Sequence, residues 1–236
     1  MAIESVFSQD YPDIEYIIID GGSRDGTFEY IQSLGNNISM SISEPDKGLY
    51  DALNKGVRHA TGDVVGFLHA DDLYASTNVL SMVAASITEN KCDSVYGDLE
   101  YVDKSDTNKI IRYWKSGSYD HTKLKQGWMP PHLTFFVKRS LYEQAKLPNG
   151  EYFDTTMKIA ADYDFMMRLL NKNDVSVQYL PEVLVKMRIG GTSNKSIKNI
   201  IKKSAEDYKA IRRNNIGGIR TLLMKNLSKI TQFYNR

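Results

Sequence analysis

Cysteine is nearly absent from this chain of 236 residues, which contains only Cys92. A single cysteine excludes an internal disulfide and favours a reducing compartment. Long apolar runs are also missing, and none approaches the roughly 18 residues that a membrane-spanning helix needs. The first residues, MAIESVFSQDYPD, have neither a basic start nor an apolar core, so no secretory signal is expected. These absences predict a globular protein of the cytoplasm.

Charge is unevenly distributed, although the net charge of the whole chain is only +1. From Lys195 to the end, 11 lysines and arginines stand against two acids, Glu206 and Asp207. The preceding 194 residues contain 19 basic and 27 acidic side chains. We therefore expect an acidic body and a basic tail with different electrostatic roles. Nucleic-acid binding is not expected, because the basic segment lacks interleaved aromatic side chains.

Strand-like and helix-like segments alternate along the first hundred residues. The β-branched run at 14–20 and the apolar run at 63–69 are typical of buried parallel strands, whereas 49–60 and 76–90 have the apolar spacing of helices. This rhythm predicts an α/β fold with a doubly wound, mostly parallel sheet. Residues 99–194 are more mixed, with antiparallel strands, a proline-marked loop and a strong helix, and we expect them to shape a substrate cleft.

Acidic side chains cluster where two of the predicted strands end. Asp20 opens the turn GGSRDGT, and Asp71 and Asp72 follow the strand at 63–69. Ligands of open α/β sheets bind outside the carboxyl ends of the strands. Adjacent carboxylates suit a hard divalent cation that also contacts phosphate oxygens. The alternatives are an ordinary turn after Asp20, and a helix cap beside a solvated acid at the Asp71–Asp72 pair.

Three segments together resemble family 2 glycosyltransferases of the GT-A fold. They are ESVFSQDYPDIEYIIIDGGSRDGT (4–27), EPDKGLYDALNKGVRHATGDVVGFLHADD (44–72) and MKIAADYDFMMRLL (157–170). The resemblance extends from about Ala2 to Ser193. It implies transfer of a sugar from a nucleotide diphosphate donor, usually linked to UDP, with inversion at the anomeric carbon.

The resemblance also implies roles for individual residues. Asp20 would bind the nucleobase, the segment 46–48 would lie near the base and the diphosphate, and Asp71 would be the metal carboxylate of a DxD-like motif. Relatives carry Asp or Asn where this chain has His69, so the ribose contact of that residue departs from the pattern. The implied donor-binding residues are Asp20, Gly22, Ser23, Asp46, Lys47, Gly48, Asn54, His69 and Asp71, and the implied ligands of Mn²⁺ or Mg²⁺ are Asp71 and Asp72.

An inverting transferase needs one general base, which the resemblance assigns to Asp162 in AADYD. Such a base contributes roughly 10²–10⁴-fold in rate. Without the resemblance, we would interpret Asp162 as an N-cap or first-turn acid favoured by the helix dipole, and Asp164 is the better partner of the dipole. Trp128 and His132 in GWMPPHLTFF are candidate acceptor contacts, and a histidine beside apolar residues is also a common packing residue. Arg188 begins a segment that either closes over the diphosphate or forms an exposed turn.

We divide the chain into three parts. Residues 1–98 form the nucleotide-sugar-binding half, 99–194 the acceptor and catalytic half of the same domain, and 195–236 a tail of basic amphipathic helices. Relatives have a further apolar strand in the centre of the sheet, between the strands at 14–20 and 63–69, and this chain lacks it. We therefore expect an N-terminally truncated version of a longer enzyme, with weakened stability and activity.

The tail has two interpretations that the sequence leaves open. Its apolar residues form helical stripes among lysines and arginines, and such a helix can lie in an anionic membrane interface. A helix of this kind can also pack on the catalytic domain and expose its charges to water. The stripes comprise Ile197, Ile200, Ile201, Tyr208 and Ile211, followed by Ile219, Leu222, Leu223, Leu227 and Ile230.

The leading interpretation is a metal-dependent inverting glycosyltransferase that acts on a glycan or a lipid-linked acceptor. It would work in the cytoplasm, peripherally at the inner face of the membrane. A sugar-nucleotide nucleotidyltransferase is the first alternative, but the glycine-rich triphosphate loop that it needs is absent. A non-catalytic binding fragment is the second alternative, because of the missing strand.

Overall fold

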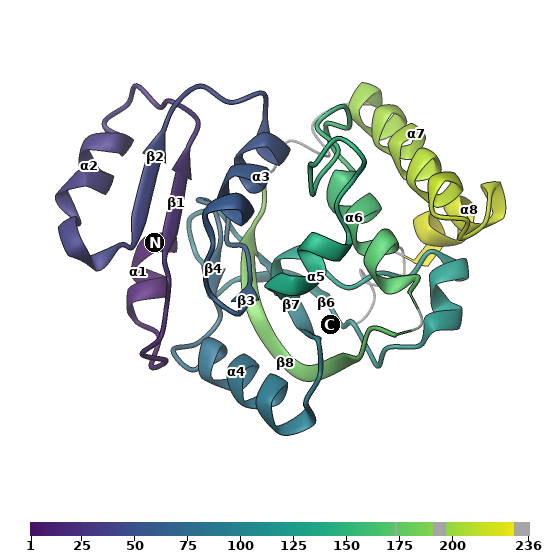
Figure 1. Cartoon of the computed structure of the whole chain (residues 1–236), viewed down its shortest axis with the longest axis horizontal. Coiled ribbons are helices and arrows are strands. Elements are labelled where there is room, and N and C mark those ends of the chain that lie inside the picture. Colours follow the sequence, from purple (N-terminus) through teal and green to yellow (C-terminus); the bar gives the residue numbers. More distant parts are fainter. Residues whose placement is uncertain (173, 191–196, 229–236) are drawn as a thin grey trace.

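The computed structural model describes residues 1–172, 174–190 and 197–228. Figure 1 shows a small two-stranded sheet with α1 and α2 on the left, a larger sheet in the middle, and the C-terminal helices α7 and α8 on the right. The helices are α1 (Ala2–Phe7), α2 (Thr27–Ser33), α3 (Leu49–His59), α4 (Val79–Asn90), α5 (Arg139–Gln144), α6 (Ala161–Leu170), α7 (Ile197–Arg213) and α8 (Ile219–Ser228). The strands are β1 (Ile17–Asp20), β2 (Met40–Ser43), β3 (Val64–Val65), β4 (Leu73–Tyr74), β5 (Ser94–Val102), β6 (Ile110–Trp114), β7 (Phe136–Lys138) and β8 (Val177–Arg188).

The strands form two sheets, and the α/β class expected from the sequence is confirmed. β1 and β2 pair in parallel, whereas the six-stranded sheet has the order β3-β7-β5-β8-β4 with β6 on β5. Within the larger sheet β5 and β8 run parallel, and the other pairs are antiparallel. The sheet is therefore mixed. The two strands between which a central strand is expected to be missing, β1 and β3, belong to different sheets.

β5 is the centre of the larger sheet because it is long enough to use both edges. One edge pairs with β8 along its whole length, while the other pairs first with β7 and then with β6. Its side chains are buried from Ser94 to Leu99, as expected of a strand that is covered on both faces. The predicted boundary between the two halves of the domain, at residue 98, falls inside this strand.

α6 is the most buried of the helices that surround the sheet. All of its residues are buried except Asp162 and Arg168. A helix that is apolar on every side belongs in a core, and this one packs its aromatic residue Phe165 against Tyr142 and Phe153. The sequence predicts this helix correctly, and its burial leaves Asp162 as the accessible acid of its first turn.

The C-terminal helices pack on the body of the protein. α7 lies against α6, and α8 lies against α7 and against a short 3-10 helix, His121–Gln126. Ala210, Ile211 and Leu222 are buried in these contacts. Of the two interpretations of the tail, packing on the catalytic domain therefore applies to the inner face of residues 197–228. Within the described ranges no helix is long and apolar enough to cross a membrane.

Candidate active site

The turn that follows β1 is organised around the Asp20 carboxylate. Its Oδ2 accepts hydrogen bonds from the backbone N–H groups of Gly22 (3.2 Å) and Ser23 (3.0 Å) and from Ser43 Oγ (2.5 Å). Its Oδ1 accepts one from Ser23 Oγ (2.5 Å). Burial would raise the pKa of Asp20, but these hydrogen bonds outweigh it and lower the pKa below the ordinary value. The carboxylate is therefore ionised and fixes the turn.

The segment after β2 lies directly against this turn. A Cβ atom at Gly21 would lie 2.6 Å from Asp46 Oδ2, so a larger residue there would displace the Asp46 side chain. Asp46 Oδ1 accepts a hydrogen bond from the N–H of Gly48 (2.8 Å), whose φ of 113° favours glycine and which leads into α3. The structure thus brings together the two segments from which donor binding is expected, 20–23 and 46–48.

The Asp71–Asp72 pair divides into one exposed and one buried carboxylate. The Asp71 side chain is 79% exposed, and its Oδ1 lies 3.4 Å from Arg188 Nη2. Asp72 is buried, and its Oδ1 accepts a hydrogen bond from the backbone N–H of Arg188 at 3.1 Å. Burial, together with the neighbouring negative charge of Asp71, raises the pKa of Asp72 to about 7, although hydrogen bonding by the Arg188 N–H lowers it. Asp71 faces outward, whereas Asp72 holds the end of β8.

Asp162 lies in the first turn of α6 and accepts a hydrogen bond from α3, the helix that follows the 46–48 segment. Tyr50 Oη, in the first turn of α3, donates a hydrogen bond to Asp162 Oδ1 at 2.9 Å. Burial and the adjacent carboxylate of Asp162 raise the pKa of Tyr50, so its hydroxyl remains a donor. Tyr50 lies two residues after Gly48, so its hydrogen bond connects the 46–48 segment to Asp162. The sequence analysis missed Tyr50, whose signal is an aromatic residue in the first turn after DKG.

Two histidines lie in the same electrostatic environment as these carboxylates. Burial and the neighbouring His132 lower the pKa of His69 to about 4, against the opposing effects of Asp162 and Asp71. Burial also lowers the pKa of His132, again against the effect of Asp162. Both imidazoles are therefore neutral at pH 7. The negative charges of Asp71 and Asp162 both act on His69 in the direction that raises its pKa.

Comparison with known proteins assigns the chain to a family. The sequence pattern of "Glycosyl transferase family 2" matches residues 1–171. A "PGL/p-HBAD biosynthesis glycosyltransferase" of Mycobacterium bovis is 30% identical over 197 residues, which are 81% of this chain and 72% of the relative. The chain belongs to glycosyl transferase family 2.

Solved structures support the fold of this family 2 chain. S. aureus TarS 1–349 in complex with UDP-GlcNAc superposes with a TM-score of 0.66 at 18% identity, over 90% of this chain and 60% of TarS 1–349. The mannosyltransferase PcManGT from Pyrobaculum calidifontis, in complex with GDP-Man and Mn²⁺, gives a TM-score of 0.59 at 18% identity, over 89% of this chain and 58% of its own. The chain also spans 36% of a longer TarS chain. At these identities the likeness establishes the GT-A-like fold alone.

A divalent cation fits the outward-facing carboxylate of this family 2 chain. Mg²⁺ and Mn²⁺ in nucleotide sites use one or two carboxylates and complete their coordination with phosphate oxygens and water. Asp71 offers such a carboxylate, although Arg188 is near one of its oxygens. In the described part of the chain no three His, Cys, Asp or Glu side chains are grouped to hold a metal without a substrate. The exposed Asp71 therefore fits a cation that arrives with the donor, whereas Asp72 is buried and accepts a hydrogen bond from the backbone of Arg188.

Two predicted binding residues use their polar atoms within the fold. Asn54 is completely buried, donates to the carbonyl of Phe153 (2.9 Å) and accepts from the N–H groups of Tyr152 and Phe153. Trp128 donates its indole N–H to the carbonyl of Ser116 at 3.0 Å and packs on aromatic rings of the core. Asn54 thus fastens the 152–153 segment to α3, and its predicted donor contact has no support in this geometry.

His132 differs from Trp128 because one of its ring nitrogens makes no hydrogen bond within the described residues. Its Nε2 is buried and has no hydrogen-bond partner among residues 1–172, 174–190 and 197–228. Its ring packs against Phe67 (5.3 Å between centroids) and Phe153 (5.8 Å). An acceptor hydroxyl is one group that could satisfy this nitrogen, so the predicted acceptor contact of His132 stays a prediction with structural support.

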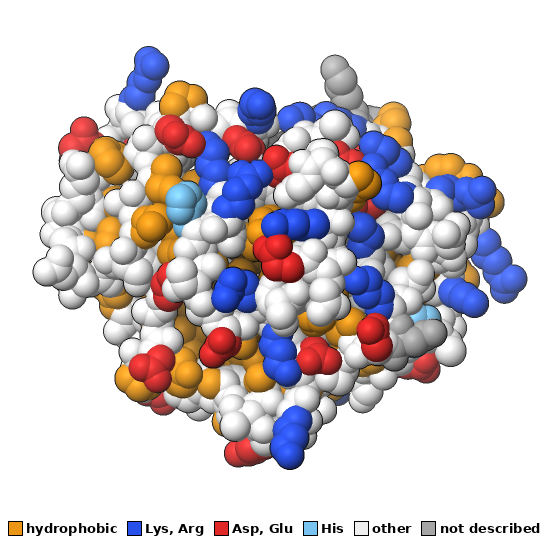
Figure 2. Space-filling model, in the orientation of Figure 1, with side chains coloured by type: hydrophobic (Ala, Val, Ile, Leu, Met, Phe, Trp, Pro, Cys, Tyr) orange, Lys and Arg blue, Asp and Glu red, His pale blue; other side chains and the backbone are white. Residues whose placement is uncertain are grey.

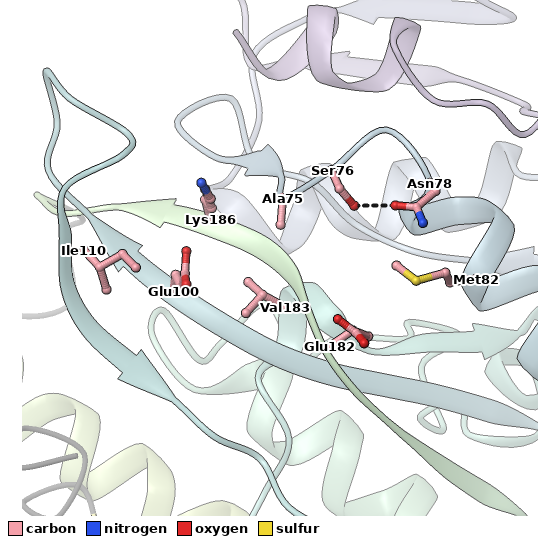
Figure 3. A pocket seen from close by; sticks show the side chains of 9 residues that line it. All are labelled: Ala75, Ser76, Asn78, Met82, Glu100, Ile110, Glu182, Val183 and Lys186. Carbon is pink, nitrogen blue, oxygen red and sulfur yellow. Dashed lines mark hydrogen bonds between the residues drawn. The ribbon is translucent and has the colours of Figure 1, made fainter. Parts of the chain in front are cut away.

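A hollow of about 520 Å³ lies elsewhere on the molecule, between the β4–α4 connection and the strands β5 and β8 (Figure 3). Its wall includes Glu100, Glu182 and Lys186, and Ser76 and Asn78 are hydrogen-bonded to each other at its rim. None of the predicted donor, metal, acceptor or catalytic residues lines it. The hollow is therefore separate from the residues to which the sequence analysis assigns the chemistry.

Proposed function

We propose that the chain transfers a sugar from a nucleotide diphosphate donor to a hydroxyl of a glycan or a lipid-linked acceptor, with inversion at the anomeric carbon. UDP-sugars are the donors we favour. Residues 1–98 would bind the donor, and 99–194 would supply the base and the acceptor side. Family membership supports the transferase class, and the complexes of TarS and PcManGT with nucleotide sugars support this class of donor.

The observation that carries the proposal is the hydrogen bond between Tyr50 and Asp162. Tyr50 stands at the start of α3, directly after the 46–48 segment, and Asp162 stands at the start of α6. One contact of 2.9 Å therefore links the expected donor segment to the expected base. The joint influence of Asp71 and Asp162 on His69 supports the same arrangement.

In the proposed reaction the acceptor oxygen attacks the anomeric carbon from the face opposite the diphosphate. The bond between that carbon and the diphosphate oxygen breaks, and the nucleoside diphosphate leaves with the electron pair. Asp162 takes the proton of the acceptor hydroxyl, and the hydrogen bond from Tyr50 orients its carboxylate. Neutral His132 would hold the acceptor hydroxyl, and Asp20 with Asp46 would position the nucleotide.

A divalent cation held by Asp71 would supply neutralisation of the diphosphate charge when the donor is bound. Arg188 is near Asp71 and would share this electrostatic role. Asp72 would act indirectly, because its carboxylate accepts a hydrogen bond from the backbone N–H of Arg188 and so fixes that residue. We accordingly restrict the proposed metal contact to Asp71.

The replacement Asp162→Asn tests the base assignment. With a panel of nucleotide sugars and Mn²⁺, release of nucleoside diphosphate should fall by roughly 10²–10⁴-fold, since the amide cannot accept the proton. Donor affinity, measured by calorimetric titration, should stay within about twofold of the original. Asp106→Asn is a matched control, because it makes the same chemical change in the exposed turn between β5 and β6.

Three outcomes would overturn the proposal. Full activity of Asp162→Asn would exclude it as the base. Failure of the unaltered chain to bind any nucleotide sugar would favour a non-catalytic fragment. Release of pyrophosphate from a nucleoside triphosphate and a sugar phosphate would favour a nucleotidyltransferase.

We further propose that the outer face of α7 and α8 contacts an anionic membrane surface, where a lipid-linked acceptor would be presented. Large apolar side chains are exposed there in spite of the packing of the inner face. On the side of α7 and α8, Figure 2 shows hydrophobic patches among Lys and Arg side chains. This combination suits an interfacial helix at the inner face of the cytoplasmic membrane. The exposed apolar residues are Ile200, Ile201, Tyr208, Ile219, Leu223 and Leu227.

Co-sedimentation with vesicles tests this surface. The chain should bind vesicles that contain anionic lipid and should bind neutral vesicles several-fold less. The double replacement Leu223→Ser and Leu227→Ser should reduce binding without unfolding, because both side chains are more than half exposed. Equal sedimentation of both proteins with both vesicle types would reject the membrane contact.

A further inference from the structure

The Glu206 side chain of α7 reaches the start of the catalytic helix α6. Its carboxylate accepts hydrogen bonds from three consecutive backbone N–H groups: Lys158 (2.9 Å), Ile159 (2.8 Å) and Ala160 (3.0 Å). Glu206 is buried, so these bonds form away from solvent. The three residues immediately precede Ala161, where α6 begins.

The three N–H groups belong to the turn that leads into α6 and to its N-cap residue. Ala160 is this N-cap residue, and it makes no side-chain capping bond. The N–H of an N-cap residue lacks an intrahelical acceptor, and alanine is a poor N-cap residue. Glu206 accepts from this N–H and from the two before it, and it brings a negative charge to the N-terminus of α6.

α7 is fixed on α6 by contacts that do not involve Glu206. Asn214 donates to Asp164 Oδ1 (3.0 Å), and Arg213 Nη1 contacts Asp164 Oδ2 (3.2 Å). Ile211 is completely buried beside them. These contacts lie two turns away from Glu206, so they would hold α7 in place if the Glu206 carboxylate were removed. The N–H groups before α6 would then lose their acceptors while the helices stayed packed.

Asp162 is the second residue of α6, and its carboxylate direction depends on the geometry of this first turn. Tyr50 fixes one of its oxygens from the other side. A displacement of about 1 Å at a catalytic group can cost roughly 10²-fold in rate. We propose that Glu206 is a positioning residue that holds the first turn of α6, and through it Asp162, in the reactive orientation. This inference rests on the proposed role of Asp162 as the base.

The consequence is that the basic tail belongs to the active-site scaffold. The distribution of charge assigns α7 to a basic tail. In the structure, Glu206 of this helix accepts the backbone hydrogen bonds next to Asp162, the proposed catalytic carboxylate. A truncation before α7 would then remove activity as well as membrane contact. The same helix carries Ile200 and Ile201 on its exposed side.

The test compares Glu206→Gln and Glu206→Ala with the unaltered chain. Gln retains an acceptor oxygen but loses the charge, so we expect kcat to fall about threefold, and roughly ten- to a hundredfold for Ala, which retains neither. The KM for the donor should change by less than about threefold, since this segment meets the 46–48 segment through an exposed hydrogen bond, from Lys158 Nζ to the carbonyl of Lys47. The graded loss of kcat at nearly constant KM is the signature of positioning.

Ile211→Ala is the matched control for lost stability. It removes buried side-chain volume from the same helix and should lower the melting temperature at least as much as the Glu206 changes, with kcat per folded molecule retained. If Glu206→Gln and Glu206→Ala keep kcat within twofold while Asp162→Asn is inactive, the positioning role is wrong and the base assignment stands. If Asp162→Asn is active, the proposed function fails first. If Glu206→Ala does not fold, the kcat of Glu206→Gln relative to Ile211→Ala decides.

Discussion

Three carboxylates on the proposed donor side, Asp25, Asp46 and Asp71, are held differently from two that pack around α6, Asp164 and Asp207. On the donor side, Asp25 and Asp46 accept hydrogen bonds from N–H groups two residues along the chain, and Asp71 is 79% exposed. Behind α6, Asp164 and Asp207 are at most 1% exposed and bind side chains far away in the sequence or on other helices. Local turns organise one side, and long-range buried pairs organise the other.

The difference distinguishes carboxylates that a bound ligand could pair with from carboxylates whose partners all come from the fold. Exposed carboxylates in local turns are inexpensive to keep ionised and are free to meet a cation or a nucleotide. Buried carboxylates are stable only when every partner is present, so they fix the helix that carries Asp162. We expect substitutions behind α6 to affect stability, and substitutions on the donor side to affect binding.

The largest loss of stability is predicted for Asp207→Ala. Asp207 bonds Lys203 Nζ (2.8 Å) and Lys225 Nζ (2.7 Å), and Lys225, whose Nζ also lies 3.1 Å from the centre of the Tyr163 ring, is only 2% exposed. Removing the carboxylate leaves a buried ammonium without its counter-charge, which costs about 3–5 kcal/mol. Urea unfolding followed by circular dichroism measures the difference.

Lys209→Ala is the control for this prediction. Lys209 is half exposed, and its Nζ lies 3.7 Å from Asp154 Oδ2, so this ion pair has one exposed partner. Such a pair is worth about 0–1 kcal/mol. If both replacements cost the same, the buried pairs behind α6 are no stronger than surface pairs, and the contrast between the two sides of the site disappears.

The sequence was informative wherever structure depends on neighbours along the chain. The apolar character of 161–170 and the position of α3 after Gly48 were predicted, and both are confirmed. Asp20 and the glycines after it also signalled their turn, because an Asx turn and a positive φ at Gly22 are local features. The strand partners were harder, since the mostly antiparallel pairing in the larger sheet depends on where distant segments return.

The tail shows why the rest could not be predicted from periodicity. One stripe was expected to contain Ile200, Ile201, Tyr208 and Ile211, but Ile211 alone of these is buried. The buried residues of α7 are as often polar as apolar, because Glu206 and Asp207, the two acids that interrupt the basic tail, are buried together with Ala210 and Ile211. A hydrophobic pattern cannot reveal a buried face whose polar groups are satisfied by partners elsewhere in the sequence.

A smaller, pH-dependent effect is predicted for Asp154→Asn. Burial would raise the pKa of Asp154, but hydrogen bonds from Thr156 and the adjacent Arg213 lower it to about 2. The folded pKa is thus below the unfolded one, near 3.8. The carboxylate therefore stabilises the fold above the unfolded pKa, and this contribution is lost as the pH falls through about 2. The shift corresponds to about 2 kcal/mol at pH 7.

Unfolding free energies of the original chain and of Asp154→Asn at pH 7, 4 and 2 measure this contribution. The difference between the two proteins should shrink toward zero at the lowest pH. Asp25→Asn is the donor-side counterpart. Asp25 accepts hydrogen bonds from the N–H and the hydroxyl of Thr27, as Asp154 does from Thr156. Asp25 is exposed, however, and no arginine contributes to the lowering of its pKa. A pH dependence of equal size in both variants would show that Arg213 adds nothing.

The smallest effect on stability, with a large effect on binding, is predicted for Asp71→Asn. The side chain is mostly exposed and its contact with Arg188 Nη2 is long at 3.4 Å, so the melting temperature should not change measurably. Titration of UDP in the presence of Mn²⁺ should show affinity at least tenfold weaker, because an amide is a poor ligand for a hard cation. Asp72→Asn should behave in the reverse way, since that carboxylate is buried against the backbone of Arg188. A loss of stability in Asp71→Asn with unchanged UDP binding would place Asp71 among the structural carboxylates, and the division between an open donor side and a closed base side would fail at its most exposed residue.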